Sequence, residues 1–387
     1  MSKYINIFAN DIDKETKEQF ENCCNHDFVV AGALMPDAHR GYVAPIGSVL
    51  LTKDKVVPAW VGYDIGCGVT AVKLNLKNSD ESLLNLIKEN TKEIFNEVFK
   101  TIPMGLGKLN HNSNLHRDTI LKFRELLASL EQKDHDDEIF DWVRRKALSN
   151  LGTLGEGNHF IELDESEGET WLVIHSGSRN IGHKVAQKYM IKSSGKDKGF
   201  EETFPLDVVS DLGKEYLAIL DFGLEFALLN RLEMVNTFVD CLEAVLSKQI
   251  NFEVWTNKNH NHAILDDYEG DKLYFHRKGA TPAKKGERGV IPGTMRDGSY
   301  LVEGLGNKDF LFSSSHGAGR KLSRKKARDT ITLDKFQEEM KDVVACVSDK
   351  TIDESPDAYK NIDDVMSLQK DSVKIIHKLK PIINWKG

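Results

Sequence analysis

Histidine, cysteine and carboxylate residues stand beside glycines and amides at five places in this 387-residue sequence. The first is the run VGYDIGCGVT, in which Asp64 and Cys67 lie among three glycines. The others are NHFIE at 158–162, HSGSR at 175–179, HNH at 260–262 and SHGAGR at 315–320. A carboxylate, a thiol and several imidazoles are the donors of transition-metal sites. A structural turn with an inert thiol would explain the first run alone, but it leaves the other four unexplained.

We expect one carboxylate, one thiol and three imidazoles to converge, namely Asp64, Cys67, His159, His175 and His260. This mixture of nitrogen, sulfur and oxygen donors suits zinc, manganese or cobalt better than calcium. Five donors exceed one tetrahedral site, and a thiolate can bridge two ions. The set therefore predicts a dinuclear centre of the kind that aligns phosphates for in-line displacement.

His316 differs from the other histidines because glycines surround it and Arg320 follows it. Small neighbours let a charged group approach the imidazole, and the backbone N–H groups of Gly317, Ala318 and Gly319 can cradle phosphate oxygens. An imidazole that attacks an activated phosphate forms a covalent phosphoramidate. The chain has neither a KxDG motif nor a GxxxxGK[ST] phosphate loop, so His316 is the predicted nucleophile.

The motifs DIGCG, GNHFIE, HSGSR, HN, RKGA, HGAGR and the terminal KG occur in an order that resembles the RtcB family of GTP-dependent RNA-splicing ligases. The resemblance extends from about Met35 to the C-terminus. It implies an enzyme that joins RNA 2',3'-cyclic phosphate or 3'-phosphate ends to 5'-hydroxyl ends. An activating partner protein and the physiological RNA stay open.

The resemblance also implies roles for individual residues. Cys67 would bridge two Mn²⁺ ions, one held also by Asp64 and His159 and the other by His175 and His260, and His316 would carry GMP. Arg179 would bind an RNA phosphate, and Lys386 would be docked in the site. The implied contacts to GTP lie at Asn158, Phe160, Glu162, Asn261, Pro292, Gly293, Thr294, Met295, Ser299 and Lys386.

Two segments depart from the family pattern. Asn259 stands where we expect a histidine, so His260 is the predicted ligand and His262 is the spare. The segment PDAHRGYVAP also differs, which affects the expected substrate preference more than the chemistry.

The net charge of −8 argues against a general nucleic-acid binder, but the chain has a local basic run between Arg320 and Arg328. We expect Arg320, Lys325 and Lys326 to guide the RNA backbone; a solvated helix face is the alternative. Five cysteines give no disulfide framework. No apolar run approaches the roughly 20 residues of a membrane span, and the N-terminus lacks a secretory signal, so we expect a cytoplasmic protein.

The pattern predicts a mixed α/β (α+β) fold in one RtcB-type catalytic domain over residues 1–387, with a deep metal-containing cleft and a helical insertion at about 184–250. Strands are expected within 28–76, including KVVPAWVGYD. Asp37 and His39 are expected in a loop past a strand end, where function is common and a turn-capping aspartate is the alternative. Helices are expected from Ser79 to about Lys100, at about 117–132 and over most of 206–248. Residues 259–262 are expected in a loop.

Two other functions use part of this pattern. A dinuclear metallophosphoesterase acting on nucleic acid would need the same metal ligands but no nucleophilic histidine. A non-catalytic RNA-binding module would leave the ligand set unexplained. Covalent labelling by GTP distinguishes a ligase from both.

Overall fold

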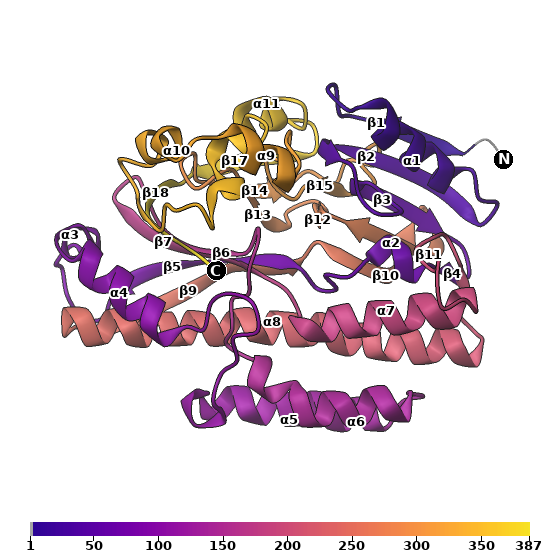
Figure 1. The fold of residues 1–387 in the computed structure, drawn as a ribbon, viewed down its shortest axis with the longest axis horizontal. Helices are drawn as coiled ribbons and strands as arrows, with labels where there is room; N and C mark the ends of the chain where they lie inside the picture. Colours follow the sequence, from indigo (N-terminus) through magenta and orange to yellow (C-terminus); the bar gives the residue numbers. More distant parts are fainter. Residues whose placement is uncertain (1–2) are drawn as a thin grey trace.

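The computed structural model describes residues 3–387, and its largest sheet has six strands in the order β16-β18-β6-β7-β5-β9. These strands are β16 (Val344–Ala345), β18 (Lys380–Lys386), β6 (Phe160–Ser166), β7 (Glu169–Ser176), β5 (Gly68–Leu76) and β9 (Ile250–Asn259). From β18 to β9 every neighbouring pair is antiparallel. Segments far apart in the sequence therefore lie side by side in one sheet (Figure 1).

The two faces of this sheet pack against different layers. Alternating residues such as Ile161 and Leu163 point into a core shared with the helices, whereas Phe160 points into a core shared with a second sheet. That sheet consists of β13 (Arg288–Pro292), β14 (Ser299–Gly304) and β17 (Val373–Lys378). Both faces are buried, which explains the apolar run from Trp171 to Ile174 in β7.

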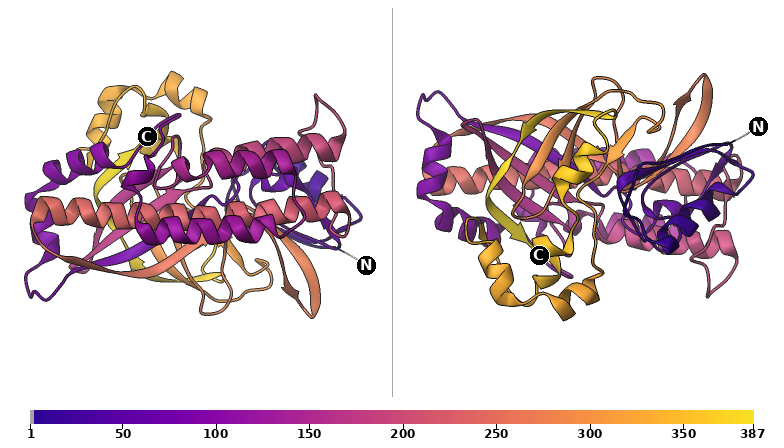
Figure 2. Two further views of the ribbon diagram at one scale, coloured as in Figure 1. Left: turned by 90° about the horizontal axis from the view of Figure 1, so that it is seen from below. Right: turned by 90° about the horizontal axis from the view of Figure 1, so that it is seen from above.

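The long helix α8 (Asp211–Leu246) runs along the helical face of the sheet (Figure 1). It is apolar around most of its surface because other helices cover its outer side, as Figure 2 also shows. The helices around it are α3 (Leu83–Glu89), α4 (Thr91–Thr101), α5 (Arg117–Glu131), α6 (Asp137–Lys146) and α7 (Asn180–Ser194). No helix within residues 3–387 is long and apolar enough to cross a membrane.

The remaining elements include a five-stranded sheet, two strand pairs and several short helices. A five-stranded sheet contains β1 (Tyr4–Ile7), β2 (Val29–His39), β3 (Ile46–Thr52), β11 (Asp271–Lys278) and β10 (Asn261–Tyr268), with α1 (Lys14–Cys24) beside it. Two strand pairs are β12 (Ala280–Pro282) with β15 (Ser313–Ser315) and β4 (Lys55–Val56) with β8 (Leu206–Asp207). The short helices are α2 (Pro58–Val61), α9 (Arg324–Thr330), α10 (Leu333–Glu339) and α11 (Ile362–Ser367), and 3-10 turns lie at Asn112–Asn114, Leu148–Asn150, Ile352–Glu354 and Pro356–Ala358.

The mixed α/β fold class is confirmed, and several boundaries differ from the expectations. The segment KVVPAWVGYD is a two-residue strand followed by α2, because Pro58 occupies the first turn of a helix. The helix expected from Ser79 begins after its cap Ser82 and is divided at Asn90 into α3 and α4. Residues 206–207 form β8, and α8 begins only after its cap Ser210.

Two predicted loops are strand segments. Asp37 and His39 belong to the last residues of β2, where Asp37 is fully buried. The stretch at 259–262 joins β9 directly to β10, with His260 between them. Both segments lie at strand ends in the interior, where their polar groups need partners within the protein.

Small residues let α8 approach the turn that precedes β5. Gly66 has a φ of +71°, and a Cβ there would lie 2.7 Å from the Cβ of Ala227 and 3.1 Å from the carbonyl oxygen of Gly223. Glycine is therefore required for both the backbone conformation and the close contact. This contact sets the distance between the DIGCG turn and α8.

Replacing this glycine should destabilise the fold. We predict that Gly66→Ala lowers the free energy of unfolding by about 2–5 kcal/mol, because the left-handed conformation and the overpacking both oppose a side chain. Gly107→Ala is the matched control, since Gly107 has a φ of +69° and nothing within 4 Å of the added Cβ. Urea unfolding of both variants measures the difference, and equal losses would show that the contact with α8 contributes nothing.

Candidate active site

A cavity of about 910 Å³ opens between the ends of the six-stranded sheet, the five-stranded sheet and the C-terminal elements. Its wall includes Asp64, Cys67, His175, His260 and His316. The structure therefore brings residues from four of the five polar motifs to one space, and the fifth motif adds Asn158 and Phe160.

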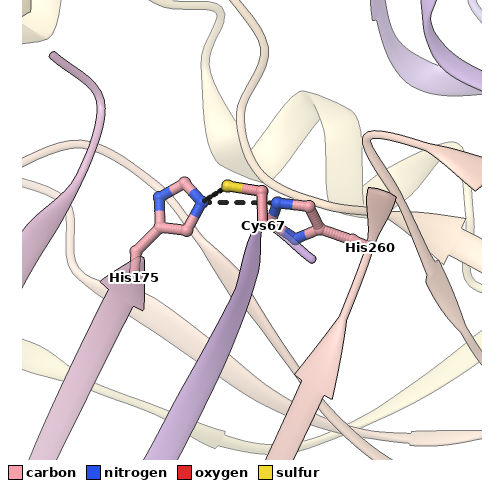
Figure 3. Close-up of side chains that lie close together, drawn as sticks. All are labelled: Cys67, His175 and His260. Carbon is pink, nitrogen blue, oxygen red and sulfur yellow. Dashed lines mark hydrogen bonds between the residues drawn. The ribbon is translucent and has the colours of Figure 1, made fainter. Parts of the chain in front are cut away.

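Cys67, His175 and His260 lie at the ends of adjacent strands and point toward one another (Figure 3). The Cys67 Sγ is 3.1 Å from Nε2 of His175, and the two histidine Nε2 atoms are 3.3 Å apart. All three side chains are buried, and their donor atoms lie within 4.8 Å of one another. This group has the composition and spacing of a metal site with a thiolate and two imidazoles.

A second group shares the same sulfur. His159 Nε2 lies 3.5 Å from the Cys67 Sγ and 3.2 Å from Oδ2 of Asp64. These three donors also lie within 4.8 Å of one another. The spare histidine, His262, instead faces Arg277, and its Nε2 lies 3.2 Å from Nη1 of that arginine. The geometry thus joins two donor groups through Cys67 and leaves His262 outside both.

Hydrogen bonds fix the orientation of two of the imidazoles. Nδ1 of His159 donates to the carbonyl oxygen of Leu154 at 3.0 Å, and Nδ1 of His175 donates to that of Asn158 at 3.1 Å. A donor at Nδ1 leaves the Nε2 lone pair free for a cation. The glycine-rich segment before β6 therefore orients ligands as well as supplying one.

The electrostatics of the cluster fit a cation. Burial lowers the pKa of His175 and His260 well below its usual value, so both imidazoles are neutral and able to coordinate. Burial raises the pKa of Asp64, but the neighbouring His159 outweighs that effect and holds the pKa below its usual range. Burial raises the pKa of the Cys67 thiol, so a bound cation is what would favour the thiolate.

His316 faces this cluster and is held by a buried aspartate. Its Nδ1 lies 2.6 Å from Oδ2 of Asp37, and its backbone N–H donates to the same oxygen at 3.0 Å. The ring also lies 4.9 Å from that of His260, measured between centroids. Gly279 makes room for it, because a Cβ there would lie 3.0 Å from the imidazole. With its Nδ1–H on Asp37, His316 keeps the Nε2 lone pair for chemistry.

The sequence does not predict the pairing of Asp37 with His316. The two residues are 279 positions apart, and the sequence indicates Asp37 as either a functional loop residue or a turn cap without relating it to His316. No local spacing signals such a pair. The only available signal was a polar residue in an apolar run that is otherwise typical of a buried strand.

Most residues predicted to contact the nucleotide line the same cavity. They are Asn158, Phe160, Glu162, Asn261, Pro292, Gly293, Thr294, Met295, Gly317, Ala318, Gly319 and Lys386. Asn261 already bonds to the protein, since its amide donates to the carbonyl of Asp64 and accepts from Gly279. Ser299 is buried outside the lining, and its hydroxyl has no hydrogen-bond partner within residues 3–387.

Two buried carboxylates, Glu162 and Glu354, line the same cavity. Oε2 of Glu162 accepts a hydrogen bond from Asn384 at 2.7 Å, and burial raises the pKa of Glu162 to about 7. Lys386 donates to Oε2 of Glu354 at 2.6 Å, and its Nζ lies 5.9 Å from the centroid of the Phe160 ring. The penultimate lysine is therefore docked, as expected.

The residues predicted to contact RNA divide into paired and free groups. Arg179 lies beside the candidate metal ligand His159, with Nη1 3.2 Å from Nδ1 of that histidine. Arg320 uses its guanidinium within the protein, with Nη1 3.0 Å from Oε1 of Glu354. Lys325 and Lys326 are exposed on α9, and no side-chain ion pair joins either to another described residue. The two lysines therefore remain available to a phosphate backbone, whereas Arg320 has protein partners.

Comparison with known proteins agrees with this arrangement. A family model described as tRNA-splicing ligase RtcB matches residues 19–387. The chain is 33% identical to RNA-splicing ligase RtcB1 of Escherichia coli strain ATCC 25922, over 97% of this chain and 95% of that protein. It is 29% identical to tRNA-splicing ligase RtcB of Nanoarchaeum equitans, over 92% of this chain and 87% of that protein.

Similarity of this extent covers both the cysteine-centred cluster and the histidine that faces it. A fold match alone would not connect these residues to a reaction. The chain belongs to the RtcB family of RNA-splicing ligases.

Proposed function

We propose that the chain acts over residues 1–387 as a GTP- and Mn²⁺-dependent ligase that joins RNA 2',3'-cyclic phosphate or 3'-phosphate ends to 5'-hydroxyl ends. The observation that carries the proposal is the position of His316, which is held by Asp37 and faces the two donor groups that share Cys67. A nucleophile beside a metal cluster in one cavity is the arrangement that nucleotidyl transfer requires. Membership of the RtcB family supports the same reaction.

The donor set fits two cations. Asp64, Cys67 and His159 would hold one ion, and Cys67, His175 and His260 would hold the other. When bound, Mn²⁺ would offset negative charge on the reacting phosphate. Arg179, beside His159, adds a fixed positive charge that suits an RNA phosphate.

His316 begins the reaction in this proposal. Its Nε2 attacks the α-phosphate of GTP, a nitrogen–phosphorus bond forms, and the bond to the departing pyrophosphate breaks. Asp37 keeps the proton on Nδ1 and stabilises the charge that develops on the ring. Gly317, Ala318 and Gly319 line the space where the phosphates would lie. The N–H of Gly317 donates to Oδ2 of Asp37, so the N–H groups of Ala318 and Gly319 are the ones that would cradle the phosphates.

The RNA end then takes the nucleotide. Water opens a cyclic end to a 3'-phosphate, whose oxygen attacks the phosphorus of GMP and releases His316. The 5'-hydroxyl of the second RNA attacks the activated 3'-phosphate, and GMP leaves. Activation is needed because a phosphate dianion is itself a poor electrophile.

The remaining residues of the cavity would recognise guanine and hold the nucleotide. Phe160 offers an apolar face, and Glu162 can accept the adjacent N–H donors of guanine. The loop Pro292–Met295, Asn158, Asn261 and Lys386 complete the pocket, with Ser299 behind it.

Covalent labelling tests the nucleophile. With α-labelled GTP and Mn²⁺, the wild-type chain should retain a label that is acid-labile and alkali-stable, and His316→Ala should retain none. Asp37→Asn should reduce the labelling rate by about 10² or more, because an amide no longer enforces the Nδ1–H tautomer. A metallophosphoesterase predicts no label on any of the three proteins, and that result would reject the ligase.

Metal analysis tests the shared sulfur. Cys67→Ser should lose at least one ion and the labelling activity together, because a hydroxyl is deprotonated far less readily than a thiol. Cys241→Ser is the matched control, since Cys241 is also buried but lies on α8 outside both donor groups. Mass-spectrometric metal counts on both variants decide the outcome. Full metal content in Cys67→Ser would contradict the shared site.

Charge reversal tests the RNA path. Lys325→Glu with Lys326→Glu should weaken RNA joining at least 10-fold and reduce the salt dependence of RNA binding by about one unit of slope per lost phosphate contact. GTP labelling of His316 should persist, because neither lysine lines the cavity. The control reverses Lys196 and Lys198, two exposed lysines after α7. Equal RNA joining and equal salt dependence in the two double variants would indicate that Lys325 and Lys326 lie on a solvated helix face and do not bind RNA.

A further inference from the structure

Arg231 is a charged residue in the centre of α8 that has no solvent exposure. Within residues 3–387 it forms no ion pair with a carboxylate, and its hydrogen bonds there go to neutral oxygens. Burying a guanidinium without a counter-ion is unfavourable unless good hydrogen bonds compensate for the lost water. The positions of those hydrogen bonds therefore indicate what the residue is for.

Three of its four acceptors belong to residues that adjoin members of the cysteine-centred cluster. Nη1 donates to the carbonyl oxygens of Gly66 at 3.0 Å and Ser176 at 2.8 Å, and Nη2 donates to Oδ1 of Asn259 at 2.7 Å. In sequence these residues directly adjoin Cys67, His175 and His260 respectively. One planar group thus joins the ends of β7, β5 and β9.

The asparagines that meet Arg231 are themselves held by α8. Nε of Arg231 donates to Oδ1 of Asn257 at 2.7 Å, and the amide nitrogen of Asn257 donates to the carbonyl of Leu228 at 3.0 Å. The amide nitrogen of Asn259 donates to the carbonyl of Leu224 at 3.2 Å. Both amide oxygens are therefore directed at the guanidinium. The departure from the family pattern at Asn259 thereby acquires a structural role.

We propose that Arg231 is a positioning residue for the metal centre, which sets the spacing of Cys67, His175 and His260 without being a ligand. The inference rests on the proposed two-metal centre. A lysine could not substitute, because its ammonium is a single point charge and cannot reach four acceptors in one plane.

The second donor group depends less on Arg231. His159 is oriented by the carbonyl of Leu154, and the preceding loop is held by Asn230, whose amide bonds to both the N–H and the carbonyl of Thr153. The group of Asp64, Cys67 and His159 should therefore survive the loss of Arg231 better than the group of Cys67, His175 and His260. This difference gives the inference a specific signature.

Cobalt titration of the full chain tests that signature. Co²⁺ reports its own coordination through ligand-field bands and through thiolate charge-transfer absorption from Cys67. The wild-type chain should bind two Co²⁺ ions. Arg231→Met and Arg231→Lys should bind one ion tightly and the second with an affinity at least 10-fold lower, and their charge-transfer band should be weaker. Arg277→Met is the matched control, because Arg277 is also buried but donates to Ser313 and Phe312 and faces His262. The Arg277→Met variant should bind two Co²⁺ ions, as the wild-type chain does.

Circular dichroism and thermal unfolding establish that each variant is folded. Two ions bound with wild-type affinity by folded Arg231→Met and Arg231→Lys would overturn the inference. If neither variant folds, Asn259→Leu decides, since it removes one acceptor beside His260 and leaves Arg231 in place; unchanged affinity for the second ion would then overturn it. A wild-type chain that binds no Co²⁺ would instead reject the proposed metal centre itself.

Discussion

The close contact between the middle of α8 and the turn before β5 is the constraint on which the rest of the structure depends. Gly66 and Gly223 carry no side chains, so the helix lies directly beneath the ends of three strands. Those ends carry the cysteine and two of the histidines that line the cavity. If α8 lay farther from the turn before β5, the side chains of Cys67, His175 and His260 would no longer lie close to one another.

Burial then decides how the charged groups behave. Glu354 is surrounded by Lys386, Arg320 and Arg324; burial alone would raise its pKa, but these cations lower it to about 2. The buried carboxylate ties the C-terminal strand to the start of α9. Arg320, Lys321 and Arg324 therefore belong to the wall of the cavity, whereas Lys325 and Lys326 lie outside it and are exposed.

The site is divided between two scaffolds. The cysteine-centred groups come from strand ends of the six-stranded sheet and its junction with β10, whereas His316 follows β15 and is held by Asp37 from β2. Sheets are rigid because their cores are packed on both faces. Two rigid parts that meet at a cavity can hold His316 opposite the candidate metal ligands.

The sequence by itself determined the mixed α/β class and the cysteine and histidines that the structure brings together, and it singled out His316, because glycine-rich motifs around reactive residues are local signals. It also indicated a helix over most of 206–248, which the structure contains as α8 with a later start. It could not predict that Asp37 would bond His316, that Arg320 would bond Glu354, or that Arg231 would join three strand ends. These contacts link residues tens to hundreds of positions apart, and only the packing of sheets and helices brings them together, because a buried polar group must find its partner wherever the fold has placed one.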